Sequence, residues 1–193
     1  MKTYVRELLL IIVLLFFLFL FFQPFQDTNT NIKLGSPPSM RVVSSTSPGL
    51  PVRLIIPKIS IDTSIQQVGV APNGAMDVPT NVIDVGWFDL GPRPGEKGSA
   101  VIDGHFDRKN GGPGIFFNLY KLKKGDKLYI QDNKGKIITF IVQGSSIYNP
   151  GYANNVFTSS NGVHLNLITC DGVWDGAKKS YSKRLVVFAD MMR

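Results

Sequence analysis

Hydrophobic residues along the chain follow two different patterns. Near the N-terminus, residues 8–22 are fifteen consecutive apolar residues with no polar position among them. Beyond residue 50, the apolar positions come instead in stretches of four to seven residues separated by turn-forming residues, which is typical of β-strands. These stretches cover residues 53–56, 99–102, 127–131, 136–142, 163–169 and 185–188. The first pattern predicts a membrane helix and the second predicts an all-β domain.

Sparse helical signals accompany these strand stretches. Only residues 115–122, and a single turn near residues 153–156, favour short helices. The sequence Asp-Asn-Lys-Gly at 132–135 predicts a hairpin turn, because Asn and Gly accept the positive φ that such turns need. Many short strands with little helix indicate a closed or nearly closed β-barrel over residues 51–193, a typical length for one domain.

The apolar run has the length and the flanking charges of a signal anchor. Counted with its neighbours, it reaches the roughly 20 residues that cross the ~30 Å hydrocarbon core. Lys2 and Arg6 precede it, so the positive-inside rule keeps residues 1–7 in the cytoplasm. A cleaved secretory signal is the alternative, but residues 23–27 offer no small-x-small cleavage site. We expect an uncleaved transmembrane anchor at residues 8–25, in the cell membrane, with the rest of the chain outside the cytoplasm.

Residues 26–50 are rich in Asn, Thr, Ser and Pro and show no hydrophobic period. Such a segment cannot bury enough apolar surface to offset its ordering entropy, so we expect a flexible linker. The net charge of the chain is +7, of which +5 falls on residues 51–193. This modest and dispersed excess of positive charge is unlike a nucleic-acid-binding surface, so we expect no nucleic acid among the partners. The expected anchor makes the cell membrane a partner.

Cys170 is the single cysteine of the chain. It cannot form an intramolecular disulfide, and two histidines cannot complete a conventional zinc site with it, so we expect no metal and no cofactor. A solitary cysteine is either a buried small hydrophobe or a reactive thiol. Cys170 follows the strand stretch 163–169 and precedes a turn signal at 171–172, which predicts a thiol at the point where a strand meets a loop.

A cysteine nucleophile needs a group that forms or stabilises its thiolate, normally an imidazole. His164 lies six residues before Cys170 on the same predicted strand, about 20 Å away in extended backbone, so it cannot reach the thiol. His105 follows the strand stretch 99–102 at a second strand-to-loop junction. From the residues alone, a catalytic His105 and a surface histidine are equally supported. Arg184 can donate to an oxyanion, but a surface ion-pairing arginine is the simpler interpretation.

Several motifs resemble one enzyme family. Residues 167–170, Leu-Ile-Thr-Cys, are similar to the Thr-Leu-x-Thr-Cys signature of sortases, the membrane-anchored cysteine transpeptidases of Gram-positive cell surfaces. Residues 86–88 (Gly-Trp-Phe), 91–96 and 104–107 (Gly-His-Phe-Asp) resemble the class F group in particular. The ordered set covers essentially all of residues 52–190, behind the expected anchor. Each motif alone is weak, but their order along the chain is specific.

The resemblance implies an all-β, sortase-like closed eight-stranded β-barrel with short helices, in which His105, Cys170 and an arginine form the active site. Cys170 would cleave the Thr-Gly bond of an LPXTG-like sorting signal on a surface protein and hold the acyl group as a thioester. An amine, such as that of a peptidoglycan precursor or a protein lysine, would then accept the acyl group. Thr169, next to the cysteine, is expected to bind substrate.

One motif departs from the class F pattern. Many members carry their arginine in a Tyr-Arg-Asp-Asn stretch, where this chain has Tyr-Ser-Lys-Arg at residues 181–184. Arg184 falls about two residues after the position of that arginine. Because strand residues two apart point to the same side, we assign the role of the active-site arginine to Arg184, with Arg93 and Arg108 as alternatives. Two other functions stay open, a hydrolytic cysteine peptidase and a catalytically silent wall-binding barrel. A silent barrel predicts a buried, inert Cys170, whereas a nucleophile of lowered pKa reacts rapidly with thiol reagents.

Overall fold

The chain folds into a closed barrel of eight strands. The computed structural model describes residues 47–192 except 109–110, 152–153 and 159–160. Within this part of the chain the strands are β1 (Pro51–Ile56), β2 (Ile61–Val68), β3 (Val85–Phe88), β4 (Gly98–Gly104), β5 (Lys127–Asp132), β6 (Ile137–Tyr148), β7 (Val163–Asp175) and β8 (Ser180–Met191). The helical elements described there are α2 (Asn154–Phe157) and two 3-10 helices, η1 (Pro57–Ile59) and η2 (Leu119–Lys121).

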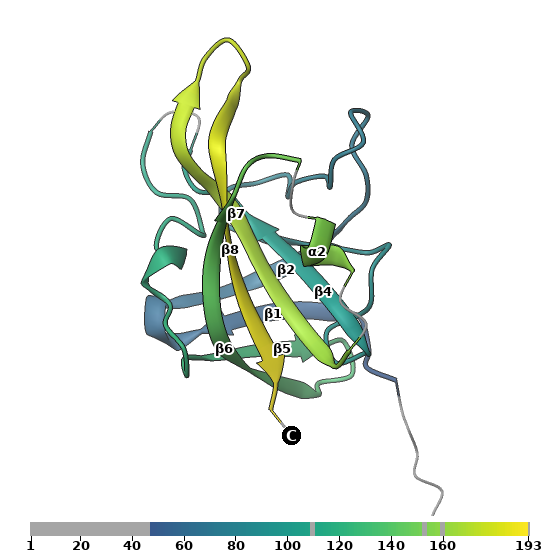
Figure 1. The fold of residues 1–193 in the computed structure, drawn as a ribbon. Helices are drawn as coiled ribbons and strands as arrows, with labels where there is room; N and C mark the ends of the chain where they lie inside the picture. The colour runs from purple at the N-terminus through teal and green to yellow at the C-terminus, as the bar shows by residue number, and fades with distance from the viewer. Residues whose placement is uncertain (1–46, 109–110, 152–153, 159–160, 193) are drawn as a thin grey trace, which may run out of the picture. The chain divides into compact units, whose positions relative to one another are not determined.

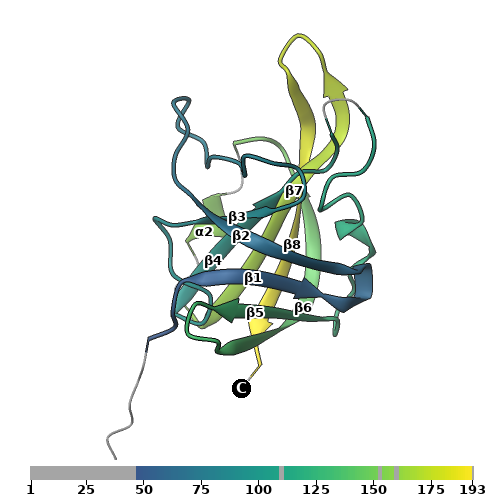
Figure 2. The same cartoon turned by 180° about the vertical axis from the view of Figure 1, so that it is seen from behind.

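Around the barrel the strands follow the order β1-β2-β3-β4-β7-β8-β6-β5, and the pairing of β1 with β5 closes it. The predicted closed eight-stranded barrel is confirmed. The pairs β2–β3 and β4–β7 are parallel, and the other pairs are antiparallel. β7 therefore has a parallel neighbour on one side and an antiparallel neighbour on the other. Figures 1 and 2 show β7 and β8 continuing together beyond the barrel as a hairpin.

The apolar stretches of the sequence correspond to six of the eight strands and miss β2 and β3. β2 alternates its buried positions with polar residues such as the exposed Asp62 and Ser64, so it contains no continuous apolar run. β3 has four residues, and one of them, Gly86, has low strand propensity. Both strands are held by pairing on two sides, β2 with β1 and β3, and β3 with β2 and β4, and such pairing can stabilise a strand without a continuous apolar run.

β7 and β8 are longer than their apolar stretches, which changes the predicted position of the cysteine. β7 continues to Asp175 and β8 already begins at Ser180, so Cys170 lies inside a strand and not at its end. Gly172, with φ of 81°, lies in a β-bulge, where β7 carries one residue more than β8. The turn signal after the cysteine therefore marks a bulge, because the partner strand continues the pairing beyond it.

The short helices agree in part with the sequence. α2 confirms the turn predicted near residues 153–156. The helix predicted over residues 115–122 is reduced to the 3-10 helix η2, and no side chain caps its N-terminus. A segment of eight residues makes too few hydrogen bonds to offset the cost of helix nucleation. Its apolar residues are buried all the same, since Phe116 and Leu119 are 0% exposed.

Alternation along the strands divides the buried side chains between two clusters. The larger cluster fills the barrel and includes Leu54 and Leu167. The smaller cluster lies on the outer face, where Val101 of β4 and Val186 of β8 are clustered with Val156 of α2. α2 therefore lies against the outer face beside β4 and β7 (Figure 1), where Asn166 Nδ2 of β7 donates to the carbonyl oxygen of Val156 at 2.6 Å.

Residues 1–46 lie outside the described part of the chain. The predicted cytoplasmic residues 1–7, the anchor at 8–25 and most of the linker at 26–50 therefore stay predictions. Within the part that the structure describes, no helix is long and apolar enough to cross a membrane.

The predicted turn between β5 and β6 is confirmed, and one buried carboxylate holds it. Asp132 is 2% exposed, and its carboxylate oxygens accept hydrogen bonds from the backbone N–H groups of Gly49, Lys134 and Lys136 at 2.8, 2.9 and 2.8 Å. Gly135 supplies the positive φ of 79° that the turn needs. The same carboxylate therefore fastens the start of the described chain to this hairpin.

We expect Asp132→Ala to lower the free energy of unfolding by about 1–3 kcal/mol, because buried N–H groups lose their acceptor. Urea unfolding of the purified protein measures the change. Asp126→Ala is the matched control, since Asp126 accepts a hydrogen bond from the exposed backbone N–H of Lys123, and its loss should cost less than about 1 kcal/mol. Equal losses in the two variants would contradict the role given to Asp132.

Candidate active site

Cys170 faces outward from the barrel, beside the bulge of β7. Leu165, Leu167 and Thr169 are buried, so alternation turns Ile168 and Cys170 to the outer face. The thiol is free and partly exposed. It is therefore not the fully buried small hydrophobe that one interpretation of the sequence predicts.

Arg184 lies directly across from Cys170. The two residues are paired in the antiparallel register of β7 and β8, and directly opposed side chains have Cβ atoms about 4.5–5.5 Å apart. The guanidinium Nη1 donates to the carbonyl oxygens of Tyr181 at 3.0 Å and Lys183 at 2.8 Å, and Nη2 donates to Ser180 Oγ at 3.2 Å. β8 therefore presents a positioned positive charge beside the sulfur.

His105 follows β4, the strand on the other side of β7. The parallel register pairs Asp103 with Ile168, so His105 and Cys170 both come two residues after that pair. Neighbouring strands lie about 4.8 Å apart, which brings the two backbones side by side. Among the described residues no hydrogen bond joins the imidazole to the thiol. His105 Nε2 instead donates to the carbonyl oxygen of Pro79 at 3.1 Å, and it carries a hydrogen there because a carbonyl only accepts.

Thr169, which the sequence predicts to bind substrate, has another place in the structure. Its side chain is 4% exposed, and Oγ1 donates to the carbonyl oxygen of Gly104 at 2.7 Å. It faces the barrel interior because it alternates with Cys170 along β7. The hydroxyl therefore joins β7 to the end of β4, and the expected contact with a substrate on the outer face is not available to it.

The surroundings of Cys170 make its thiol a weaker acid than usual. Burial raises the pKa of Cys170, the charge of Arg184 opposes this, and the carboxylates of Asp103 and Asp107 raise it further. The thiol is therefore protonated in the free protein at neutral pH. This differs from the lowered pKa of a rapidly reacting nucleophile, because burial and the two carboxylates outweigh the charge of Arg184.

A contact that the sequence analysis missed joins the segment after His105 to β8. The hydroxyl of Tyr181 donates to the carboxylate of Asp107, and this hydrogen bond, aided by burial, raises the pKa of Tyr181 to about 12. The Tyr181 ring also packs edge-to-face against Phe106 and Trp174, at centroid distances of 5.6 and 5.3 Å. These contacts fix the histidine segment relative to the strand that carries the arginine.

His164 takes no part in this arrangement. It lies six residues before Cys170 on β7, about 20 Å along the strand. Its Nδ1 contacts Asp190 Oδ1 at 2.6 Å, and its Nε2 donates to the carbonyl oxygen of Asn161 at 2.7 Å. The sequence-based exclusion of His164 is confirmed, and the Asp190 contact fastens β7 to β8.

The two alternative arginines lie elsewhere. Arg93 belongs to the loop before β4, and the seven residues of β4 span about 23 Å before the chain reaches His105. Its Nη1 donates to the carbonyl oxygen of Pro48 at 3.2 Å. Arg108 is exposed, and its Nε donates to the carbonyl oxygen of Pro113 at 3.0 Å. Neither arginine lies on a strand that pairs with β7.

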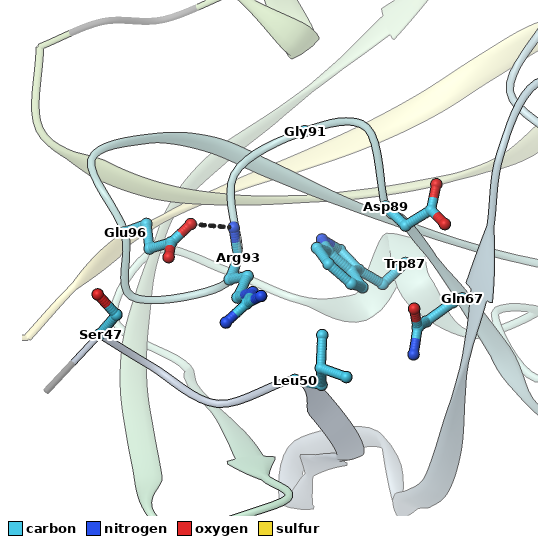
Figure 3. A pocket seen from close by; sticks show the side chains of 8 residues that line it. All are labelled: Ser47, Leu50, Gln67, Trp87, Asp89, Gly91, Arg93 and Glu96. Carbon is cyan, nitrogen blue, oxygen red and sulfur yellow. Dashed lines mark hydrogen bonds between the residues drawn. The ribbon is translucent and has the colours of Figure 1, made fainter.

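A separate pocket of about 580 Å³ lies by the β3–β4 loop (Figure 3). Its lining residues are Ser47, Leu50, Gln67, Trp87, Asp89, Gly91, Arg93 and Glu96. Polar groups around it are engaged within the protein, since the Trp87 indole donates to the Pro92 carbonyl oxygen at 3.2 Å and the Arg93 N–H donates to Glu96 Oε2 at 2.9 Å. Neither here nor elsewhere in the described part of the chain do three or more His, Cys, Asp or Glu side chains gather to hold a metal ion.

The structure is a closed eight-stranded barrel with a candidate cysteine nucleophile on β7. An arginine lies opposite the cysteine on β8, and a histidine directly follows the neighbouring strand β4. The family model of the sortase domain matches residues 54–192, and the chain belongs to the sortase family. It is 30% identical over 143 residues to sortase A of Bacillus anthracis, covering 72% of this chain and 59% of that protein. The chain thus spans about three fifths of the length of this relative.

Solved structures share the barrel. Sortase A from Corynebacterium diphtheriae has a TM-score of 0.58 at 23% identity, over 76% of this chain and 62% of that one. Sortase C-1 from Actinomyces oris has a TM-score of 0.59 at 24% identity, over 74% of this chain and 71% of that one. At these identities the likeness shows a common fold.

We expect Arg184→Gln to move the pH midpoint of Cys170 alkylation upward and to slow alkylation at pH 8 roughly three-fold. The sign follows from the charge, because the guanidinium stabilises the thiolate and its removal raises the pKa of Cys170. Iodoacetamide labelling across pH, read by mass spectrometry, measures the midpoint.

Two variants control this experiment. Arg184→Lys retains the positive charge and should move the midpoint less. Arg108→Gln removes the same charge at an exposed position and should leave it unchanged. A midpoint in Arg184→Gln that stays constant or falls would show that the guanidinium does not act on the thiol.

Proposed function

We propose that this protein is a cysteine transpeptidase that cleaves a sorting signal on a surface protein and transfers the acyl group to an amine. One observation carries the proposal: the register of the sheet sets Arg184 opposite Cys170 and brings the residue after β4, His105, to its other side. Membership of the sortase family supports the chemistry of this arrangement. Cys170 is the nucleophile, Arg184 the fixed positive charge and His105 the proton carrier.

The first half of the reaction starts from a protonated thiol. His105 takes the thiol proton, and the Cys170 sulfur attacks the carbonyl carbon of the Thr-Gly bond in an LPXTG-like signal. Arg184 stabilises the negative charge that develops on the carbonyl oxygen, since its guanidinium does not lose its proton. The C–N bond then breaks, the amine leaves with the proton held by His105, and a thioester remains on Cys170.

An amine completes the reaction. It attacks the thioester carbonyl while His105 accepts its proton, a new C–N bond forms, and the Cys170 sulfur leaves and regains a proton. The acceptor is an amine at the cell surface, such as that of a peptidoglycan precursor or a protein lysine. Water in place of the amine gives hydrolysis at the same site, which is the peptidase alternative.

The cellular setting of this proposal rests on the sequence. Residues 1–7 lie in the cytoplasm, residues 8–25 anchor the protein in the cell membrane and residues 26–50 form an extracytoplasmic linker. Residues 51–193 form the catalytic domain outside the cytoplasm, where a surface-protein substrate and an amine acceptor are both present. The motifs between residues 86 and 107 support class F within the family.

A catalytically silent wall-binding barrel is the weaker alternative. It predicts a buried and inert Cys170. The raised pKa of the thiol is compatible with this alternative, whereas the partial exposure of the thiol on the outer face and the positioned arginine opposite it favour a nucleophile. A hydrolytic peptidase uses the same three side chains and differs from the transpeptidase in its products.

We expect Cys170→Ala to abolish the covalent adduct with peptides varied around an LPXTG-like sequence, and their cleavage, while thermal unfolding stays nearly unchanged. His105→Ala should lower the rate at least about 100-fold, because it removes general acid–base catalysis. His164→Ala is the matched histidine control and should retain the activity of the unaltered protein. Mass spectrometry of adduct and products reads out all three variants. Adduct formation by Cys170→Ala would rule out the proposed nucleophile.

Product analysis with and without an added primary amine, such as a lysine-containing peptide, separates the two enzymatic functions. A transpeptidase should yield a product that carries the added amine in place of the leaving segment. Hydrolysed peptide alone, at every amine concentration, would assign the site to a peptidase.

A further inference from the structure

A carboxyl group that the proposed mechanism does not use lies near Cys170 on the outer face. Asp103 of β4 pairs with Ile168, and Ile168 and Cys170 are successive outward-facing residues of β7. Asp103 is therefore the diagonal neighbour of the cysteine across adjacent strands, a relation that corresponds to about 7–8 Å. It also lies two residues before His105. Asp103 thus belongs to the surroundings of the candidate active site.

The Asp103 carboxyl is placed at an energetic cost. Its Oδ1 is buried and has no hydrogen-bond partner among the described residues. Buried polar atoms normally have a partner, because desolvation without a compensating hydrogen bond is unfavourable. Ser99 Oγ, on the same strand, is in the same situation but carries no charge. An unsatisfied carboxyl beside a nucleophile therefore points to a functional and not a structural role.

The neighbouring strand leaves space for this carboxyl. Gly86 of β3 pairs with Asp103, and a Cβ at Gly86 would lie 2.7 Å from Asp103 Oδ1 and 3.0 Å from the Val68 side chain. A larger residue at this position would displace the carboxyl from its place. The glycine of the Gly-Trp-Phe motif thus leaves the space in which the Asp103 carboxyl lies.

Charged and titratable groups approach the two residues from each neighbouring element. These groups are Asp77 of the β2–β3 loop, His105 and Asp107 of the segment after β4, and Tyr181 and Arg184 of β8. Burial, and then the charge of Asp77, raises the pKa of Asp103 well above its usual value. A negative charge on Asp103 in turn opposes a negative charge on Cys170. The charge of Asp103 is therefore one of the influences on the thiol, after burial and the charge of Arg184.

We propose that Asp103 is a positioning residue of this site, which acts on Cys170 through its charge and sets how readily the thiol releases its proton. While the carboxyl is ionised, the sulfur keeps its proton and is a poor nucleophile. When the carboxyl takes up a proton from solvent, this opposition to the thiolate is removed. The thiol proton can then move to His105. This last step rests on the proposed function, whereas the effect of the charge on the thiol does not.

Iodoacetamide labelling of Cys170 in the whole chain tests the charge effect directly. Asp103→Asn should move the midpoint of the labelling curve to lower pH and raise the rate at pH 7.5 about two- to four-fold. The loss of a nearby negative charge favours the thiolate, and the lower nucleophilicity of a more acidic thiol offsets part of the gain. Asp62→Asn is the matched control, because it removes an exposed carboxylate paired with Arg53, and it should leave the curve unchanged.

A midpoint that stays constant or rises in Asp103→Asn would overturn the inference. Asp103→Ser, which is also uncharged, carries the same test if the Asn variant does not fold. Asp103→Glu retains the negative charge, so its midpoint should lie closer to that of the unaltered protein than the midpoint of Asp103→Asn does. A purely structural role does not predict this outcome. If the curve shifts as expected but no acyl group is transferred to an amine or to water, the inference on Asp103 holds and the proposed function fails.

Discussion

Strand β7 pairs in parallel with β4 and antiparallel with β8, and this double pairing determines where each candidate catalytic group lies. Its register with β8 sets Arg184 opposite Cys170, and its register with β4 brings His105 alongside. A slip by one residue would turn the cysteine into the barrel and Thr169 onto the outer face, because strand side chains alternate. The buried inner residues of β7, such as Leu167, hold this register in place.

The electrostatics of the site follow from the same arrangement. Arg184 favours a thiolate, whereas burial and the carboxylates of Asp103 and Asp107 oppose it. Asp107 itself accepts a hydrogen bond from the hydroxyl of Tyr181, which joins the segment after His105 to β8. The free protein therefore holds a thiol of raised pKa opposite a fixed positive charge.

Much of the fold could be predicted from the sequence. Six strands carry continuous apolar stretches, and the turn at 132–135 has residues that tolerate positive φ. β2 and β3 escaped prediction because β2 alternates buried and polar positions and β3 has only four residues, so each depends on pairing with its neighbours and not on a continuous apolar run. The place of the cysteine within its strand was missed for a related reason. A glycine after a strand predicts a turn, unless a partner strand continues and converts it into the bulge found at Gly172.

For the candidate site, the sequence by itself determined which side chains were available: one cysteine, two histidines of which spacing excluded His164, and a few arginines. Residue types and spacing along one strand are local properties, so they can be read without a fold. Only the tertiary structure decided that Arg184 opposes Cys170, that Thr169 faces inward, and that Asp103 approaches the thiol. These facts depend on the register of β7 with the next strand β8 and with the distant strand β4, and on burial, and the sign of the thiol's pKa shift depends on both.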